Sequence, residues 1–77
     1  MTPTDIGEFH AACRAVVARC PDPYARSYAD AGLGLTDPDY VRVQCLYILN
    51  NMGSWRGDAA RQSRATFKAL SKKQKGD

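Results

Sequence analysis

Long hydrophobic runs are missing from this sequence of 77 residues. No apolar run approaches the roughly 20 residues that a membrane-spanning helix needs. The N-terminal residues Met1 to Asp5 have neither a basic start nor an apolar stretch, so they do not resemble a secretory signal. The three cysteines, an odd number, do not fit a disulfide framework. Together these features predict a protein of the reducing cytoplasm that does not bind a membrane.

Strand signals and phosphate-binding glycine patterns are missing as well. The sequence has no alternating apolar run and no Asn-Gly or Asp-Gly turn between β-branched segments. A chain this short buries only about 60% of the surface that it exposes when unfolded, which leaves little volume for a deep active site. We therefore expect an all-α single domain, residues 1–77, that is a compact bundle of about four short helices. We expect it to bind no cofactor and to have no catalytic residues.

Proline marks the start of three of the four helices that the sequence predicts. Thr2, Asp22 and either Thr36 or Asp37 are suited to cap a helix, and Pro3, Pro23 and Pro38 suit the first positions of the helices that follow. The predicted helices cover about residues 3–20, 23–32, 38–52 and 54–73. Gly32 is well placed as a left-handed stop after the second helix. The C-terminal tail, about residues 72–77, is expected to fray.

Apolar residues in these segments recur at spacings of three and four, as they do along one face of a helix. In the third segment they cover most of the circumference, which is typical of a buried helix. We therefore expect the third helix to lie at the centre of the bundle. The residues expected in the core are Phe9, Val16, Val17, Cys45, Ile48, Leu49, Met52 and Phe67.

His10 and the cysteines are the candidate metal ligands and nucleophiles. Imidazole and thiolate are ligands that zinc prefers, but Cys13 and Cys20 would lie roughly 10 Å apart along a helix. His10 and Cys13 share a helical face, yet no orienting third group or oxyanion site accompanies them. We therefore interpret Cys13, Cys20 and Cys45 as small buried hydrophobic residues and expect no metal site.

Positive charge is concentrated toward the C-terminus. Residues 1–55 contain four basic and six acidic residues, whereas residues 56–77 contain seven basic and two acidic ones. In the fourth segment the cations recur every three or four residues, so they share a face opposite the apolar one. The candidate partner-binding residues are those of this face and of the corner where it begins: Trp55, Arg56, Arg61, Arg64, Lys68 and Lys72.

Several roles are open to this basic face. It can bind an acidic protein surface, where Trp and Arg often contribute most of the binding energy. It can neutralise nucleic-acid phosphates, and the turn at Gly53 loosely fits a helix-turn-helix. It can also be a solvated face that keeps the protein soluble. The tyrosines at 24, 28, 40 and 47 indicate either rings that complete the core or a contact in a homo-oligomer.

Two stretches in the second half, Leu46–Asn51 and Gly53–Arg61, resemble segments of short uncharacterised proteins from phages and mobile elements of proteobacteria. Residues Tyr24–Ala29 give a looser likeness to the same proteins. The resemblance implies a compact, non-enzymatic inhibitor of host defence, of the anti-CRISPR type, that acts by occupying a surface. Many such inhibitors are acidic mimics of nucleic acid, and this basic chain departs from them. We therefore expect it to bind and block a larger protein or ribonucleoprotein complex, with nucleic-acid binding as the alternative.

Overall fold

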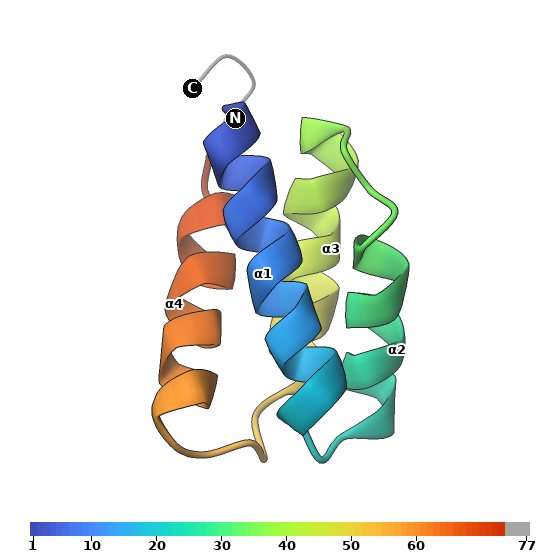
Figure 1. The fold of residues 1–77 in the computed structure, drawn as a ribbon, viewed down its shortest axis with the longest axis vertical. Helices are drawn as coiled ribbons and strands as arrows, with labels where there is room; N and C mark the ends of the chain where they lie inside the picture. Colours follow the sequence, from blue (N-terminus) through green and yellow to red (C-terminus); the bar gives the residue numbers. More distant parts are fainter. Residues whose placement is uncertain (74–77) are drawn as a thin grey trace.

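In the computed structural model, which describes residues 1–73, four helices pack side by side in an antiparallel bundle (Figure 1). They are α1 (Pro3–Arg19), α2 (Pro23–Gly32), α3 (Pro38–Asn51) and α4 (Asp58–Ser71). Contacts link α1 to α2, α2 to α3, α3 to α4 and α4 back to α1, whereas α1 and α3 meet only weakly across the middle. The expected all-α bundle is confirmed. Of these helices, none is both long enough and apolar enough to cross a membrane.

Three helices begin at capping residues that the sequence predicts. Thr2 and Asp5 form a capping box, in which each side chain accepts a hydrogen bond from the other residue's backbone N–H, at 3.1 and 2.9 Å. The carboxylates of Asp22 and Asp37 accept hydrogen bonds from the first turns of α2 and α3, so Asp37 rather than Thr36 caps α3. Because such caps satisfy otherwise unpaired amides, each stabilises its helix by about 1 kcal/mol.

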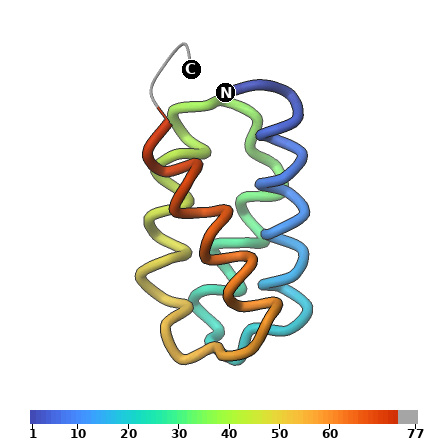
Figure 2. The backbone as a smooth tube through the Cα atoms, turned by 90° about the vertical axis from the view of Figure 1, so that its left-hand side faces the viewer, coloured from blue at the N-terminus to red at the C-terminus, as the bar shows by residue number. Residues whose placement is uncertain are grey.

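The fourth helix begins later than the sequence predicts. Residues 52–57 form the loop between α3 and α4, and α4 begins at Asp58 rather than near Ser54. Gly57 precedes the helix with φ +106°, a conformation that strains any residue with a Cβ. Trp55 and Arg56 therefore belong to a loop and do not extend the pattern of α4. The helices α3 and α4 run antiparallel along their length (Figure 2), unlike the steeply crossed helices of a helix-turn-helix.

The core lies between the four helices, and most of the expected residues are in it. Six of the eight are fully buried: Phe9, Val16, Cys45, Ile48, Met52 and Phe67. The phenyl rings of Phe9 and Phe67 meet edge to face across the α1–α4 boundary, with centroids 6.1 Å apart. Val17 is exposed and Leu49 only half-buried, so their expected full burial is wrong.

The prediction that the third helix is central is also wrong. Only one side of α3 is buried, at Val41, Cys45 and Ile48. In a ring of four helices each helix presents one face to the core and another to solvent. The apolar residues on the other side of α3, among them Val43 and Leu46, are exposed. The apolar residues around most of α3 therefore form a buried side and an exposed apolar surface, and they do not mark α3 as a central helix.

Gly32 has a different role from the expected left-handed stop. It is the last residue of α2, and among residues 1–73 only Gly57 has a positive φ. A Cβ on Gly32 would lie 2.9 Å from Cys13 Sγ and 2.9 Å from Phe9 Cζ. The glycine therefore lets the end of α2 approach α1 closely.

The C-terminal end of the described chain is held against the bundle. Lys73 Nζ lies 3.1 Å from Asp5 Oδ2, and Arg42 Nη1 donates a hydrogen bond to the Lys73 carbonyl oxygen at 3.2 Å. These contacts join the end of α4 to α1 and α3. Lys73 thus has defined partners within the tail that the sequence predicts to fray, and the remainder of that tail, residues 74–77, lies outside the described residues.

Candidate binding face on helix α4

The fourth helix has a buried side and an exposed side. Ala60, Ser63, Phe67 and Leu70 are buried, at spacings of three and four. Beyond Asp58 in the first turn, the exposed residues on the other side are Arg61, Gln62, Ala65, Lys68, Ala69 and Lys72, the residue that caps the end of the helix. Figure 2 shows this helix in front, with α1 and α3 on either side and no other segment of residues 1–73 over it. The side chains of this exposed side can therefore meet a partner directly, and we call these six residues the α4 face.

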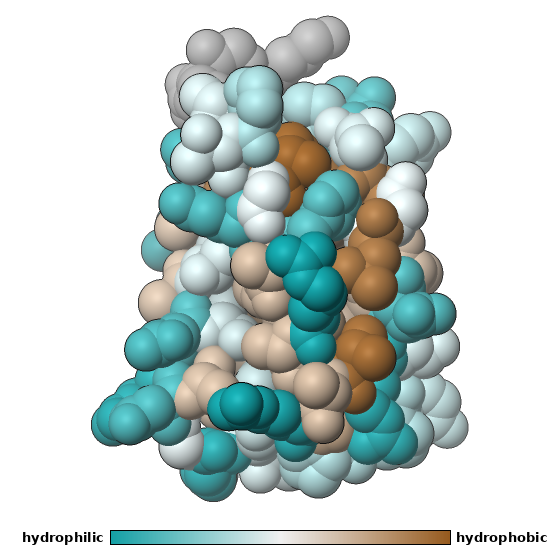
Figure 3. All heavy atoms as spheres, in the orientation of Figure 1, coloured by the Kyte–Doolittle hydropathy of each residue, from teal (hydrophilic) through white to brown (hydrophobic). Residues whose placement is uncertain are grey.

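Three of the predicted site residues give the α4 face its charge. Arg61, Lys68 and Lys72 are exposed, and the exposed Ala65 and Ala69 have short side chains that lie between them. Along a helix, Arg61 and Lys68 are about 10 Å apart and Lys68 and Lys72 about 6 Å. Hydrophilic side chains follow the α4 edge of the molecule (Figure 3). Because the alanine side chains are short, the surface of a partner can approach the helix closely. The longer arginine and lysine side chains can then contact that surface on either side of the alanines.

Arg61 already has one partner. Its guanidinium pairs with Asp58, three residues earlier on the same helix, and both side chains are at least three-quarters exposed. Such an exposed pair is screened by water and contributes little to stability. Arg61 can therefore exchange Asp58 for an acidic group of a partner at small cost.

Arg64 is placed differently from the other cations. It is half-buried, and its Nη2 donates hydrogen bonds to the carbonyl oxygens of Trp55 at 3.1 Å and Met52 at 3.4 Å. These bonds fasten the loop of residues 52–57 to α4. Arg64 therefore supports the fold, and its removal would disturb the loop as well as any binding.

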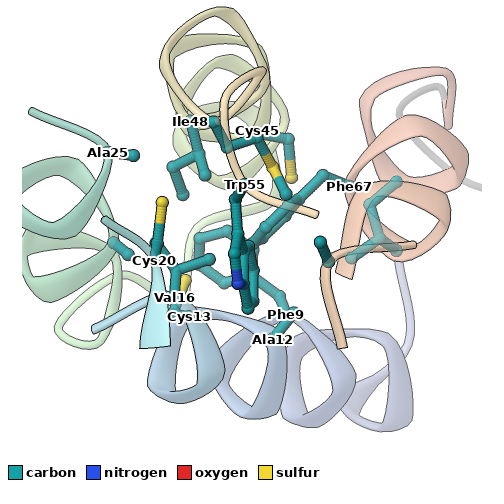
Figure 4. Packing of buried hydrophobic residues seen from close by; sticks show 14 of the residues in the cluster. Phe9, Ala12, Cys13, Val16, Cys20, Ala25, Cys45, Ile48, Trp55 and Phe67 are labelled. Carbon is teal, nitrogen blue, oxygen red and sulfur yellow. The ribbon is translucent and has the colours of Figure 1, made fainter. Parts of the chain in front are cut away.

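Trp55 lies in the core and not at an exposed corner of the face. Its side chain is 7% exposed and lies between side chains of α1, such as Val16, and of α3, such as Ile48 (Figure 4). The expectation that its ring anchors a partner is therefore wrong, because the loop turns the indole inward to close the end of the bundle. Arg56 is exposed beside it and donates a hydrogen bond from Nη1 to the Gly53 carbonyl oxygen at 2.6 Å.

A shallow groove borders the α4 face on the side of α1. It has a volume of about 250 Å³ and is lined by Glu8, Ala11, Ala12, Ala15, Gln62, Ser63 and Thr66. This volume is below the range of about 300–1,000 Å³ that is typical of small-molecule sites, so the groove suits a single side chain. No pattern along the chain predicts this groove, because its walls come from two helices that are far apart in the sequence.

The alternative metal and nucleophile sites are not assembled in the described structure. His10 Nε2 lies 2.7 Å from the Leu35 carbonyl oxygen, so its ring joins α1 to the α2–α3 loop. Burial raises the pKa of both Cys13 and Cys45 to about 12, with the neighbouring Cys45 contributing at Cys13. Within residues 1–73, no group of three or more His, Cys, Asp or Glu side chains is arranged to hold a metal ion. As expected, Cys13, Cys20 and Cys45 are buried free thiols.

Comparison with protein-family models, with curated proteins and with solved structures finds no match to this chain.

Proposed function

We propose that this chain is a non-enzymatic interaction module that binds an acidic surface of a larger protein or ribonucleoprotein complex. Arg61, Lys68 and Lys72 pair with acidic groups of the partner, and Arg56 extends the contact at the start of the helix. The observation that carries the proposal is the exposure of Arg61, Lys68 and Lys72 on one side of α4, with alanines between them. Complementary charge at an interface speeds association and selects the partner.

The groove beside the α4 face favours a protein partner. A protruding side chain of the partner can enter the space between Ala11 and Ala15 on one wall and Thr66 on the other. A partner side chain that fills the groove would exclude water from the neighbouring charged contacts, and these contacts would then be stronger. A nucleic-acid backbone would use the cations but has no comparable side chain to insert.

The cellular role that we propose is inhibition by occupancy. A bound module can block a host defence complex without any chemical step, so it needs only a complementary surface. The resemblance to short phage and mobile-element proteins supports an inhibitor of the anti-CRISPR type. Its basic face would then occupy a protein surface or the RNA of the complex, and would not imitate DNA.

Nucleic-acid binding is the second candidate, and the burial of Trp55 favours it. Because the indole lies in the core, the α4 face presents cations without an aromatic anchor. Such a surface would bind phosphates independently of sequence. With three phosphate contacts, the affinity for DNA would fall with a log–log salt slope of about −2.7.

Charge reversal on two faces tests the proposal. The variants Arg61→Glu and Lys68→Glu alter the α4 face, whereas Arg14→Glu makes the same change at an exposed position of α1. Each variant is titrated by fluorescence anisotropy against purified CRISPR effector complexes and against a labelled random DNA duplex, at low and physiological salt.

We expect the effector titrations to show binding by the wild type and by Arg14→Glu, with a loss of tenfold or more in the two α4 variants. Steeply salt-dependent binding to DNA alone would favour the second candidate. Equal affinities for all three variants and the wild type would refute the assignment of the α4 face.

A further inference from the structure

A second exposed surface lies on the outer side of α2 and α3. It consists of apolar and aromatic side chains that are between 38% and 69% exposed: Tyr24, Tyr28, Tyr40, Val43, Leu46 and Tyr47. We call these six residues the tyrosine face. Apolar patches of several hundred Å² on the surface of a protein are often functional. These residues are not part of the α4 face and have no role in the function proposed above.

Contacts between α2 and α3 make the tyrosine face one continuous surface. The rings of Tyr28 and Tyr47 stack, with centroids 5.4 Å apart and an interplanar angle of 23°. Gln44 Nε2 donates a hydrogen bond to the Tyr28 carbonyl oxygen at 2.7 Å. The two helices lie next to each other in the bundle (Figure 1). A partner that reaches α3 therefore also meets α2.

The tyrosine face has almost no unbalanced charge. Its exposed neighbours Ser27, Ala31 and Asn50 are uncharged. Asp39 is exposed on α3, but its carboxylate pairs with Arg42 Nη2 at 3.0 Å. A neutral apolar surface can face an identical copy of itself without repulsion. The α4 face cannot do so, because its cations would meet cations.

We propose that a second copy of this chain covers the tyrosine face, which gives a homodimer with twofold symmetry. In such an interface the same patch serves both chains, so self-complementarity is the chemical requirement. Tyrosine suits it because the ring supplies apolar area while the hydroxyl can bind water or the other chain at the rim. A domain this small gains buried core by associating.

The size of the tyrosine face indicates what class of interface it can form. Its six side chains expose on the order of 500 Å² per chain, compared with about 800 Å² per partner in a standard stable interface. An interface below this size belongs to the weak, transient class. The dimer forms at high concentration and leaves the α4 face of each chain uncovered.

Sedimentation velocity over a wide range of concentrations tests the dimer. The first variant, which we call the tyrosine variant, carries Tyr24→Asp and Tyr40→Asp, at the two most exposed tyrosines. Both positions lie in the first turn of a helix, where an acidic residue is favourable, so the fold is expected to persist. The control carries Ala65→Asp and Ala69→Asp, which make the same change in charge on the α4 face. Circular dichroism verifies that each variant is helical.

The wild type and the control are expected to rise from the 8.5 kDa of one chain toward twice that mass between about 5 and 500 µM, because a weak, transient interface forms only at high protein concentration. The tyrosine variant is expected to remain at 8.5 kDa throughout. If it does not fold, the single variant Tyr40→Asp gives the same comparison.

A wild type that stays monomeric at the highest concentration would overturn the proposal, and so would a folded tyrosine variant that associates like the wild type. Neither result would affect the function proposed for the α4 face, because that function is measured by binding to a different molecule.

Discussion

Replacing Gly32 with alanine probes how closely α2 packs on α1. The new Cβ would lie 2.9 Å from both Cys13 Sγ and Phe9 Cζ, and 3.3 Å from Phe9 Cε2. Contacts below 3.0 Å require atoms to move. Cys13 and Phe9 are fully buried, so neither side chain can turn into solvent to make room.

The expected cost follows from two opposing effects. Inserting a methyl group into a packed core costs about 1–3 kcal/mol. Alanine recovers up to about 1 kcal/mol relative to glycine, through helix propensity and the lower entropy of the unfolded chain. We therefore expect Gly32→Ala to lower the free energy of unfolding by about 1–2 kcal/mol, out of about 4–12 kcal/mol for a domain of this length.

Gly7 provides a matched control for the same substitution. It lies inside α1, and a Cβ there would meet nothing within 4 Å. Gly7→Ala has the benefit of alanine without the steric cost, so it should raise the free energy of unfolding by about 0.5–1 kcal/mol. The same substitution of glycine by alanine is therefore expected to lower the free energy of unfolding at residue 32 and to raise it at residue 7.

Urea unfolding measures both variants through the fluorescence of Trp55, the one tryptophan in the chain, which is buried. With a slope of about 1 kcal/mol per molar urea, the midpoint should fall by about 1–2 M for Gly32→Ala and rise by about 0.5–1 M for Gly7→Ala. Adding Cys13→Ala to Gly32→Ala should recover part of the loss, since Sγ no longer obstructs the methyl group. A Gly32→Ala midpoint at or above that of the wild type would show that α2 does not approach α1 as described.

Two further predictions concern titratable groups. Because burial raises the pKa of Cys13 and Cys45 to about 12, these thiols should react with a disulfide reagent near pH 8 only as fast as the chain unfolds. Rapid modification without denaturant would contradict their burial. The Thr2 amide and Lys73 hold the pKa of Asp5 below its ordinary value of 3.8, so the folded chain binds fewer protons there than the unfolded chain. That stabilisation is present above pH 3.8 and is lost as the pH falls through the lower folded value. Between pH 3.8 and the lower folded pKa, the urea midpoint of Asp5→Asn should depend less on pH than that of the wild type. An unchanged dependence would show that Asp5 does not cause the loss of stability in acid.

Local signals in the sequence were sufficient for the helices and for much of the core. Thr2, Asp22 and Asp37 cap helices because a side-chain oxygen reaches an amide two or three residues away. The spacing of Phe9, Cys13 and Val16 likewise depends only on the geometry of α1, so their shared buried face could be predicted. The concentration of cations in residues 56–77 is also a property of the sequence alone.

The tertiary structure decided which apolar residues are buried and which cations are exposed. Trp55 turns inward because the α3–α4 loop places it over the open end of the core, and Arg64 is held by the carbonyl oxygens of the same loop. Gly32 is needed for the approach of a different helix and not for the turn that follows it. The burial of α3 depends on where its three neighbours lie. Periodicity along one helix cannot show this, because it records which residues share a face but not what that face meets.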